Sequence, residues 1–230
     1  MDADGANQRQ LTAGAGRNYA PVVSPDGRFA VFHSNRTGVW QIWRMNRDGS
    51  DPLALTSARE GSNWPRVSPD SRWVIYEHAE SGALATLWRV PIEGGTPVHL
   101  TDKLSARPSI SPDGRLIAYW QKDQEPNAPW RIAVINFEGG PPVNLFDVPQ
   151  SRANGNSEIR WTQDGSGVIY MDFRNSISNL RLQPLDGSPA TQLTDHAKDQ
   201  FYSFDFARDG RLIFARGLTT NDVVLIGDQR

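Results

Sequence analysis

The residues best placed to do chemistry in this 230-residue chain are aspartates that recur at a nearly fixed spacing. The sequence Ser24-Pro25-Asp26-Gly27 returns four times in related form, with steps of 44, 43, 51 and 45 residues between successive aspartates. These aspartates are Asp26, Asp70, Asp113, Asp164 and Asp209. Carboxylates can hold calcium, but these segments lack the dense alternating oxygen ligands of a calcium loop. We therefore predict that the aspartates accept hydrogen bonds from backbone N–H groups two residues on and so hold tight turns.

Other catalytic or metal-binding chemistry has no support in the sequence. The chain contains neither a Gly-x-Ser-x-Gly nucleophile motif nor a His-Glu-x-x-His zinc motif. It has no cysteine, which excludes disulfides, iron–sulfur clusters and thiol catalysis within it. The four histidines are scattered over different segments: His33, His78, His99 and His196. We predict no catalytic residue, no metal site and no cofactor.

The elements that position these side chains are short strands. Each aspartate turn lies between two apolar runs, such as residues 20–23 and 28–32, and such runs bounded by turn residues predict strands. A second series of turns, beginning with Asp48-Gly49, runs out of phase with the first. Each repeat therefore contains four strands joined by tight turns, which is the pattern of one propeller blade. Ser71 replaces the turn glycine in the second repeat, so we expect slight strain or a different closure there.

The sequence predicts one all-β domain over residues 1–230, a five-bladed β-propeller of four-stranded antiparallel blades. The predicted blades are residues 13–56, 57–101, 102–146, 147–194, and 195–230 together with 1–12. The last repeat holds only three predicted strands, the third at residues 222–226, and residues 4–12 form a turn and fourth strand without a preceding blade. We expect the N-terminal strand to complete the last blade and close the ring, which would remove an exposed sheet edge.

The candidate binding residues lie where the innermost strands surround the propeller axis. They are Arg66, Arg107, Arg160, Glu158 and Asp205, together with Trp64 and Tyr19. Charged groups there need partners, because an unpaired charge is costly to bury. One interpretation is a self-satisfied ring in which the arginines pair with the two acids. The other is an anion-accepting pocket that presents guanidinium groups to a carboxylate or phosphate. The irregular segments 121–129 and 148–157 are a second candidate partner surface.

Composition excludes several classes of protein. The formal net charge of −2 provides no basic footprint for nucleic acid, and no apolar stretch is long enough for a spanning helix. The start of the chain has no signal-peptide core. Residues 1–5 align with residues 45–49 inside the first complete repeat, which predicts that the chain is the propeller part of a longer protein or a gene product that begins inside one. Compartment and oligomeric state do not follow from these features.

The repeat resembles that of the TolB-type, WD-repeat-like β-propellers. The resemblance rests on Pro-x-x-Ser-Pro-Asp-Gly, a third strand such as residues 41–45, and the later Asp-Gly and Leu-Thr pairs. Residues 199–226 resemble the C-terminal propeller of bacterial serine/threonine kinases and winged-helix regulators. This resemblance implies an extracytoplasmic, periplasmic sensing or docking module. TolB itself has six blades, and the predicted count of five departs from that.

Two classes of function follow. The favoured one is a non-catalytic binding or sensor module, part of a larger bacterial signalling protein, that binds a protein, a peptide or a small anionic ligand on its loop-bearing face. The alternative is the substrate-gating propeller of a peptidase resembling the prolyl oligopeptidase or tricorn groups. The sequence ends at Arg230 without a hydrolase domain after the propeller, which favours the first class.

Overall fold

The computed structural model describes most of the chain as strands and turns. The described residues are 6–14, 16–57, 61–79, 84–125, 127–148, 157–174, 177–198, 200–207 and 210–217. None of these residues is helical, and the strands form five antiparallel sheets. The all-β fold class and the four-stranded antiparallel sheets are thereby confirmed.

The strands of every sheet follow chain order, from the first strand at one edge to the last at the other. The first sheet contains β1 (Asn18–Val23), β2 (Phe29–Ser34), β3 (Gln41–Asn46) and β4 (Leu53–Ala54). The second contains β5 (Ser62–Val67), β6 (Trp73–His78), β7 (Thr86–Pro91) and β8 (Val98–His99). The third contains β9 (Leu104–Ile110), β10 (Leu116–Lys122), β11 (Trp130–Asn136) and β12 (Asn144–Asp147). The fourth contains β13 (Ile159–Trp161), β14 (Gly167–Arg174), β15 (Ile177–Pro184) and β16 (Thr191–Gln192). The fifth contains β17 (Gln200–Phe206) and β18 (Leu212–Gly217).

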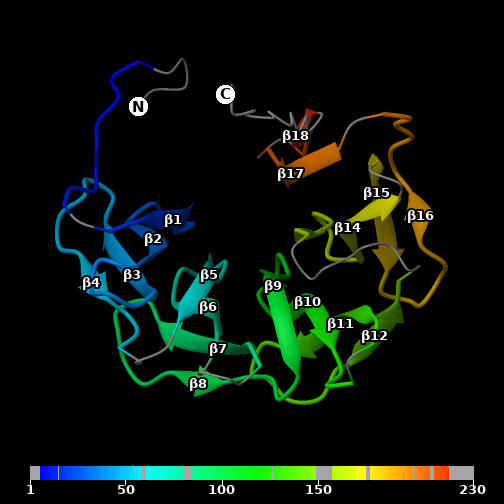
Figure 1. The fold of residues 1–230 in the computed structure, drawn as a ribbon, viewed down its shortest axis with the longest axis horizontal. Helices are drawn as coiled ribbons and strands as arrows, with labels where there is room; N and C mark the ends of the chain where they lie inside the picture. The colour runs from blue at the N-terminus through cyan, green and yellow to red at the C-terminus, as the bar shows by residue number, and fades with distance from the viewer. Residues whose placement is uncertain are drawn as a thin grey trace, which may run out of the picture.

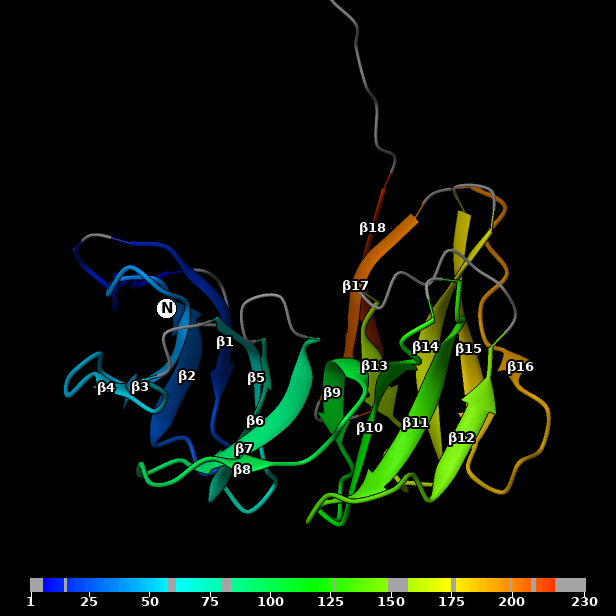
Figure 2. The ribbon, with the colours of Figure 1, turned by 60° about the horizontal axis from the view of Figure 1, so that its bottom comes forward.

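The sheets stand side by side around a common centre, as the blades of a propeller do (Figures 1 and 2). In Figure 1 the first strands, β1, β5 and β9, face the centre, and the fourth strands, β4, β8, β12 and β16, lie on the periphery. The first strand of a repeat is therefore its innermost strand. This arrangement places side chains from different repeats around one axis.

The predicted closure of the ring is not confirmed. Figure 1 shows an arc that is open between β1 and β18, and the last sheet has two strands in the described part of the chain. Residues 6–12 contain no strand, so the fourth strand expected there is not observed. The third strand expected at 222–226, and residues 1–5, lie outside the described residues. The observed architecture is four four-stranded sheets followed by a two-stranded one.

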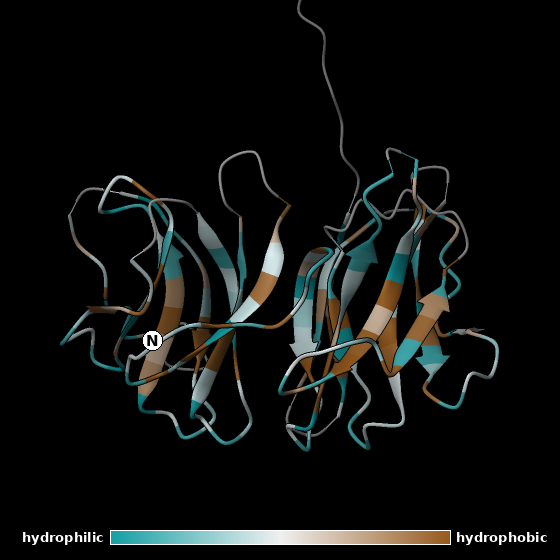
Figure 3. Cartoon of the chain, turned by 90° about the horizontal axis from the view of Figure 1, so that it is seen from below, coloured by the Kyte–Doolittle hydropathy of each residue, from teal (hydrophilic) through white to brown (hydrophobic). Residues whose placement is uncertain are grey.

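The hydrophobic core lies between neighbouring sheets. Trp120 of the third sheet and Tyr170 of the fourth are buried and meet edge to face, with ring centroids 5.9 Å apart. Equivalent apolar clusters join the first sheet to the second and the second to the third. Figure 3 shows the hydrophobic colour along the strands and the hydrophilic colour in many of the turns. The wedge between sheets is thus filled by large side chains, which fixes the sheets relative to one another.

The repeated aspartates hold the turns between the first and second strands. In the first repeat the Ser24 hydroxyl donates to Asp26 Oδ1 at 2.6 Å, and the N–H of Arg28 donates to the same oxygen at 3.0 Å. The same pair of bonds recurs in the second, third and fourth repeats. The hydroxyl bond and then the backbone bond hold the pKa of Asp26 below its ordinary value. The turn role predicted for these aspartates is confirmed in four repeats, whereas Asp209 lies outside the described residues.

Candidate functional site

The inner strands of the first three sheets share a strained backbone position. Ala20, Trp64 and Arg107 occupy equivalent places in β1, β5 and β9, and their φ angles are 47°, 53° and 55°. Each position lies where the pairing with the second strand shifts register, which is a β-bulge. A left-handed backbone costs a non-glycine residue about 1–2 kcal/mol, so the surrounding structure must hold these residues in place. Such positions are concentrated at functional sites.

Two of these strained residues are anchored by the sheet before them. The N–H of Trp64 donates to Nδ1 of His33 at 3.4 Å, and the N–H of Arg107 donates to Oε1 of Glu77 at 2.7 Å. His33 and Glu77 occupy equivalent positions at β2 and β6. The bulge thus connects β5 and β9 to the second strand of the preceding sheet.

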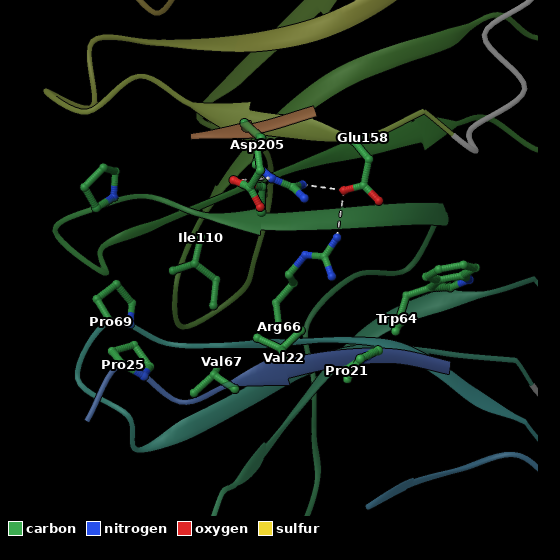
Figure 4. Close-up of a pocket in the computed structure, with 14 residues that line it drawn as sticks. Pro21, Val22, Pro25, Trp64, Arg66, Val67, Pro69, Ile110, Glu158 and Asp205 are labelled. Carbon is green, nitrogen blue, oxygen red and sulfur yellow. Dashed lines mark hydrogen bonds and ion pairs between the residues drawn. The ribbon is translucent and has the colours of Figure 1, made fainter. Parts of the chain in front are cut away.

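A cavity of about 710 Å³ lies between the inner strands (Figure 4). One part of its lining is apolar and comes from the first three sheets. We call Val22, Val67 and Ile110 the apolar wall, and Pro25, Pro69 and Pro112 of the aspartate turns the proline rim. The other part is charged and contains Arg66, Glu158, Arg160 and Asp205. The volume is in the range of small-ligand pockets.

The charged side chains form one connected group around Glu158. Nη2 of Arg66 donates to Oε2 of Glu158 at 2.8 Å, and Nη1 of Arg160 donates to the same oxygen. Nη1 of Arg107 lies 3.6 Å from Oε1 of Glu158, and Nε of Arg160 lies 3.2 Å from Oδ1 of Asp205. We call these five residues the charged cluster. The structure therefore brings together all five charged residues predicted at the channel, and it pairs them internally.

The charge balance of the charged cluster is uneven. Three guanidinium groups face the carboxylates of Glu158 and Asp205, which leaves an excess of one positive charge among these five groups. Glu77, which accepts the N–H of Arg107 and has a pKa of about 7, offsets this excess only as it ionises. Burial opposes the ionisation of Glu158, but the attraction of the arginines outweighs it and holds the pKa of this carboxyl below its ordinary value. The Glu158 carboxyl group is therefore ionised at neutral pH.

Arg107 is the most weakly paired arginine of the charged cluster. Its side chain is 11% exposed, and its guanidinium carbon lies 3.5 Å from the centroid of the Trp64 ring, a cation–π contact. Its guanidinium donates no hydrogen bond to another described residue, because the contact with Glu158 is too long for one. Arg107 does not line the cavity itself, but it contacts Trp64 and Glu158, which do, and it supplies one of the three positive charges around Glu158.

The two predicted aromatic residues have different places. Trp64 lines the cavity, whereas Tyr19 does not. Tyr19 is 49% exposed and contacts His33 and Trp40, with ring centroids 5.8 and 5.6 Å apart. His33 in turn contacts the Trp64 ring at 5.4 Å. Tyr19 thus belongs to an aromatic group beside the pocket.

Two residues of the site were missed by sequence reasoning, namely Glu77 and His33. Burial raises the pKa of Glu77 to about 7, although the N–H and the charge of Arg107 oppose this rise. Burial lowers the pKa of His33 to about 4, and the nearby Arg107 charge adds to the effect. Both residues stand seven positions after a turn aspartate, so a polar side chain at that point of an apolar strand was the available signal.

The second predicted partner surface is only partly described. Residues 149–156 of the segment 148–157 lie outside the described residues, as does residue 126 of the segment 121–129. Within the latter, Asp123 pairs with Lys103 and Arg131. In the described ranges, no group of three or more His, Asp or Glu side chains is placed to hold a metal ion. No helix long and apolar enough to cross a membrane is found there either.

The family of the chain follows from its sequence as well as from this fold. The family model of the TolB beta propeller domain matches residues 1–148, which is more than half of the chain. This chain belongs to the TolB β-propeller domain family. The uncharacterized protein Atu1656 of Agrobacterium fabrum (strain C58) is similar, with 34% identity over 180 residues. These residues cover 75% of this chain and 46% of Atu1656, so the chain spans less than half of that relative.

Solved structures share the propeller fold with this TolB-family chain. The putative TolB from Agrobacterium tumefaciens has a TM-score of 0.68 and 18% identity over 90% of this chain and 72% of that one. A structure from work on two prolyl endopeptidases has a TM-score of 0.62 and 11% identity over 84% of this chain and 32% of that one. At these identities the likeness concerns the fold alone. The TolB-type resemblance is thus confirmed, while the finer resemblance to kinase and regulator propellers stays a prediction.

Proposed function

We propose that this TolB-family propeller is a non-catalytic binding module whose central pocket accepts an acidic group from a protein, a peptide or a small ligand. The observation that carries the proposal is the charged cluster, in which three arginines converge on one carboxylate and outnumber the two acids of the cluster, Glu158 and Asp205. A second carboxylate or a phosphate entering the pocket would balance the remaining positive charge. Guanidinium groups suit this role because their planar N–H donors match the geometry of these anions.

Glu158 keeps the arginines in position before a ligand arrives. It contacts Arg66 and Arg160 by hydrogen bonds, and both side chains are less than one-fifth exposed. An internal counter-ion prevents the guanidinium groups from repelling one another or turning outward. Ligand binding then costs little conformational entropy, because the arginine side chains are already ordered, which is the advantage of a preorganised site.

The wider role extends the same proposal. We infer that the module senses or docks a partner as part of a larger bacterial signalling protein, in an extracytoplasmic compartment such as the periplasm. Both inferences rest on the resemblance to TolB-type propellers. A reporter fusion of the full-length gene product, active only outside the cytoplasm, would test the location.

A second candidate function is the substrate-gating propeller of a peptidase. The similarity of fold to the prolyl endopeptidase structure favours it. A gating propeller must let a peptide pass along its axis, so a bulky group placed across the pocket would slow hydrolysis of long peptides by the whole enzyme. A binding module would lose affinity for its anionic ligand after the same change.

The binding proposal is tested by thermal unfolding with a panel of anions. Succinate, citrate, phosphate and phosphoserine are titrated at pH 6 and pH 8, with succinamide as the neutral control. A ligand at 100 times its Kd adds about 2.7 kcal/mol to the stability, which raises the Tm by several degrees. The rise should be lost in Arg107→Gln and kept in Arg115→Gln, which changes an exposed turn arginine. A Tm that no anion raises up to about 10 mM, where a Kd of 0.1 mM would already give this gain, would overturn the proposal.

A further inference from the structure

The two parts of the pocket differ in what they can bind. The apolar wall and the proline rim come from the first three sheets, whereas Glu158, Arg160 and Asp205 come from the fourth and fifth. Arg66 crosses between them, since it starts in β5 and reaches Glu158 (Figure 4). A ligand that fills the pocket must therefore offer an apolar group and an anion close together.

The pocket also has a direction. The prolines of the rim are exposed, so that end is open to solvent, whereas the arginines and Glu158 are 11–19% exposed. Asp205 is the exposed member of the charged cluster, at 68%. Figure 4 places Trp64 at the end opposite Pro25 and Pro69, and Arg107 is stacked on its ring. A chain that enters at the rim meets the apolar wall, then the charged cluster, and then this stacked pair. The arginines therefore lie deeper than the rim, where the leading end of an entering chain would reach them.

The last residue of a polypeptide is complementary to these features of the pocket. Its α-carboxylate is separated from its side chain by a single carbon, so an anion and an apolar group are held side by side at the leading end. We propose that the central pocket captures the free carboxyl terminus of a partner protein that ends in an apolar residue. The α-carboxylate binds the arginines of the charged cluster, and the last side chain packs on the apolar wall. This inference rests on the proposed function, because it names the ligand class of the same site.

The experiment uses the 230-residue chain and rhodamine-labelled hexapeptides in fluorescence anisotropy. The probe is Gly-Ser-Gly-Ser-Val-Leu with a free carboxyl terminus. Three comparison peptides are its C-terminal amide, the free acid ending in Ser in place of Leu, and the amide Gly-Ser-Val-Glu-Leu-Ser, which carries its carboxylate internally. Decanoate serves as a competitor that has an apolar chain and a carboxylate but no peptide.

We expect the free acid to bind at least about tenfold tighter than its amide, because the amide loses the charge-assisted hydrogen bonds that the carboxylate makes to the guanidinium groups. Arg107→Gln should remove this preference, and Arg115→Gln should keep it. Ile110→Ser, in the apolar wall, should reduce the preference for Leu over Ser at the last position. This second variant leaves the charged cluster intact, so the inference stays testable if Arg107→Gln does not fold.

Several results would overturn the inference while leaving anion binding in place. One is an internal glutamate peptide that binds as tightly as the free acid. Another is decanoate that competes as well as the unlabelled free-acid peptide, which would assign the pocket to amphiphilic acids in general. Equal binding of acid and amide, unaffected by Arg107→Gln, would overturn the carboxyl-terminal site. Failure of the proposed function is separate, because it requires that the anion panel leave the Tm unchanged as well.

Discussion

The aspartate turns and the inner strands occupy fixed places in every repeat, yet they behave in opposite ways. The turns are alike, since a hydroxyl and a backbone N–H bind the same aspartate oxygen in four repeats. The inner strands differ at equivalent positions two residues before the turn. These positions hold Val22, Arg66, Ser109, Arg160 and Asp205, all of which line the cavity.

The difference separates two tasks. The turn joins the first two strands in every blade, so the same hydrogen bonds to its aspartate serve in each repeat. The inner position faces a shared cavity rather than its own blade, so its side chain is free to differ from one repeat to the next. The places where the repeats diverge therefore coincide with the charged cluster and with Val22 of the apolar wall, whereas Val67 and Ile110 stand one residue before the turn, where every repeat is apolar. The substitutions below compare the two regions.

The largest effect is expected for Glu158→Gln. The change leaves Arg66, Arg107 and Arg160 facing one another without their shared counter-ion, and removing one partner of a buried ion pair typically costs about 3–5 kcal/mol. Because these side chains are partly exposed, we expect a loss of about 3 kcal/mol in the free energy of unfolding, measured with urea.

The control for Glu158→Gln is Glu93→Gln. Glu93 also bridges two arginines, Arg28 and Arg44, but it is 55% exposed, so its loss should cost less than about 1 kcal/mol. Added acetate should stabilise Glu158→Gln more than the parent chain, since the external anion replaces the missing one. Equal costs for the two variants would contradict the central role of Glu158.

The sequence alone predicted the turns, the membership of the charged cluster and, as one of two interpretations, its internal pairing, but not which arginine contacts which acid. The turn chemistry is local: Ser24 and Asp26 are two residues apart, so their types and spacing suffice. The three arginines and Glu158 come from different repeats, and only the fold brings them within contact. Glu77 was missed because the sequence signal, a polar residue in an apolar strand, says nothing of its burial or of the N–H of Arg107, which is 30 residues away in the sequence. Tyr19 was placed at the channel because β1 is an inner strand, whereas the bulge after it turns its ring toward Trp40.

The second prediction concerns pH. The pKa of Glu77 is about 7 in the folded chain and near its ordinary value of 4.5 in the unfolded chain, so the folded state binds more protons between these values. Stability therefore falls as the pH rises from about 4.5 to about 7, by up to about 3 kcal/mol. Glu77→Gln should remove this loss and be more stable relative to the parent at pH 8 than at pH 5.

His33 acts in the opposite direction. Its pKa is about 4 in the folded chain against 6.5 in the unfolded chain, so its contribution to stability is lost as the pH falls from about 6.5 to about 4. The two slopes oppose each other in the parent, and Glu77→Gln should expose that of His33. Urea unfolding at pH 5, 6, 7 and 8 measures both. Parallel curves for parent and variant would show that Glu77 does not titrate in this range.

The third prediction concerns the turns. Ser111 donates to Asp113 and accepts the N–H of Leu116 at 2.9 Å while buried, so Ser111→Ala should cost about 1–2 kcal/mol. Ser24→Ala removes the same contacts in the first repeat and should cost the same amount within about 0.5 kcal/mol. Alanine at the inner positions Val22 and Arg160 should give unlike costs. If the costs of the two turn variants differ as widely as those of the two inner-strand variants, the contrast between uniform turns and divergent inner strands is contradicted.

The smallest effect is expected at Ser71, where one turn departs from the repeat. Ser71 keeps the left-handed backbone of the glycines it replaces, with a φ of 60°, and its N–H donates to the Ser68 carbonyl at 2.8 Å. The strain predicted for this turn is thus present, and the hydroxyl compensates by accepting the N–H of Asp26 from the neighbouring blade at 3.0 Å. Ser71→Gly relieves the strain and loses this bond, so the stability should change by less than about 0.5 kcal/mol. Ser71→Ala loses the bond and keeps the strain, so it should cost about 1 kcal/mol. If urea unfolding gives the two variants equal stability, the strain at this turn has no energetic weight, and the turns would be alike in energy as well as in geometry.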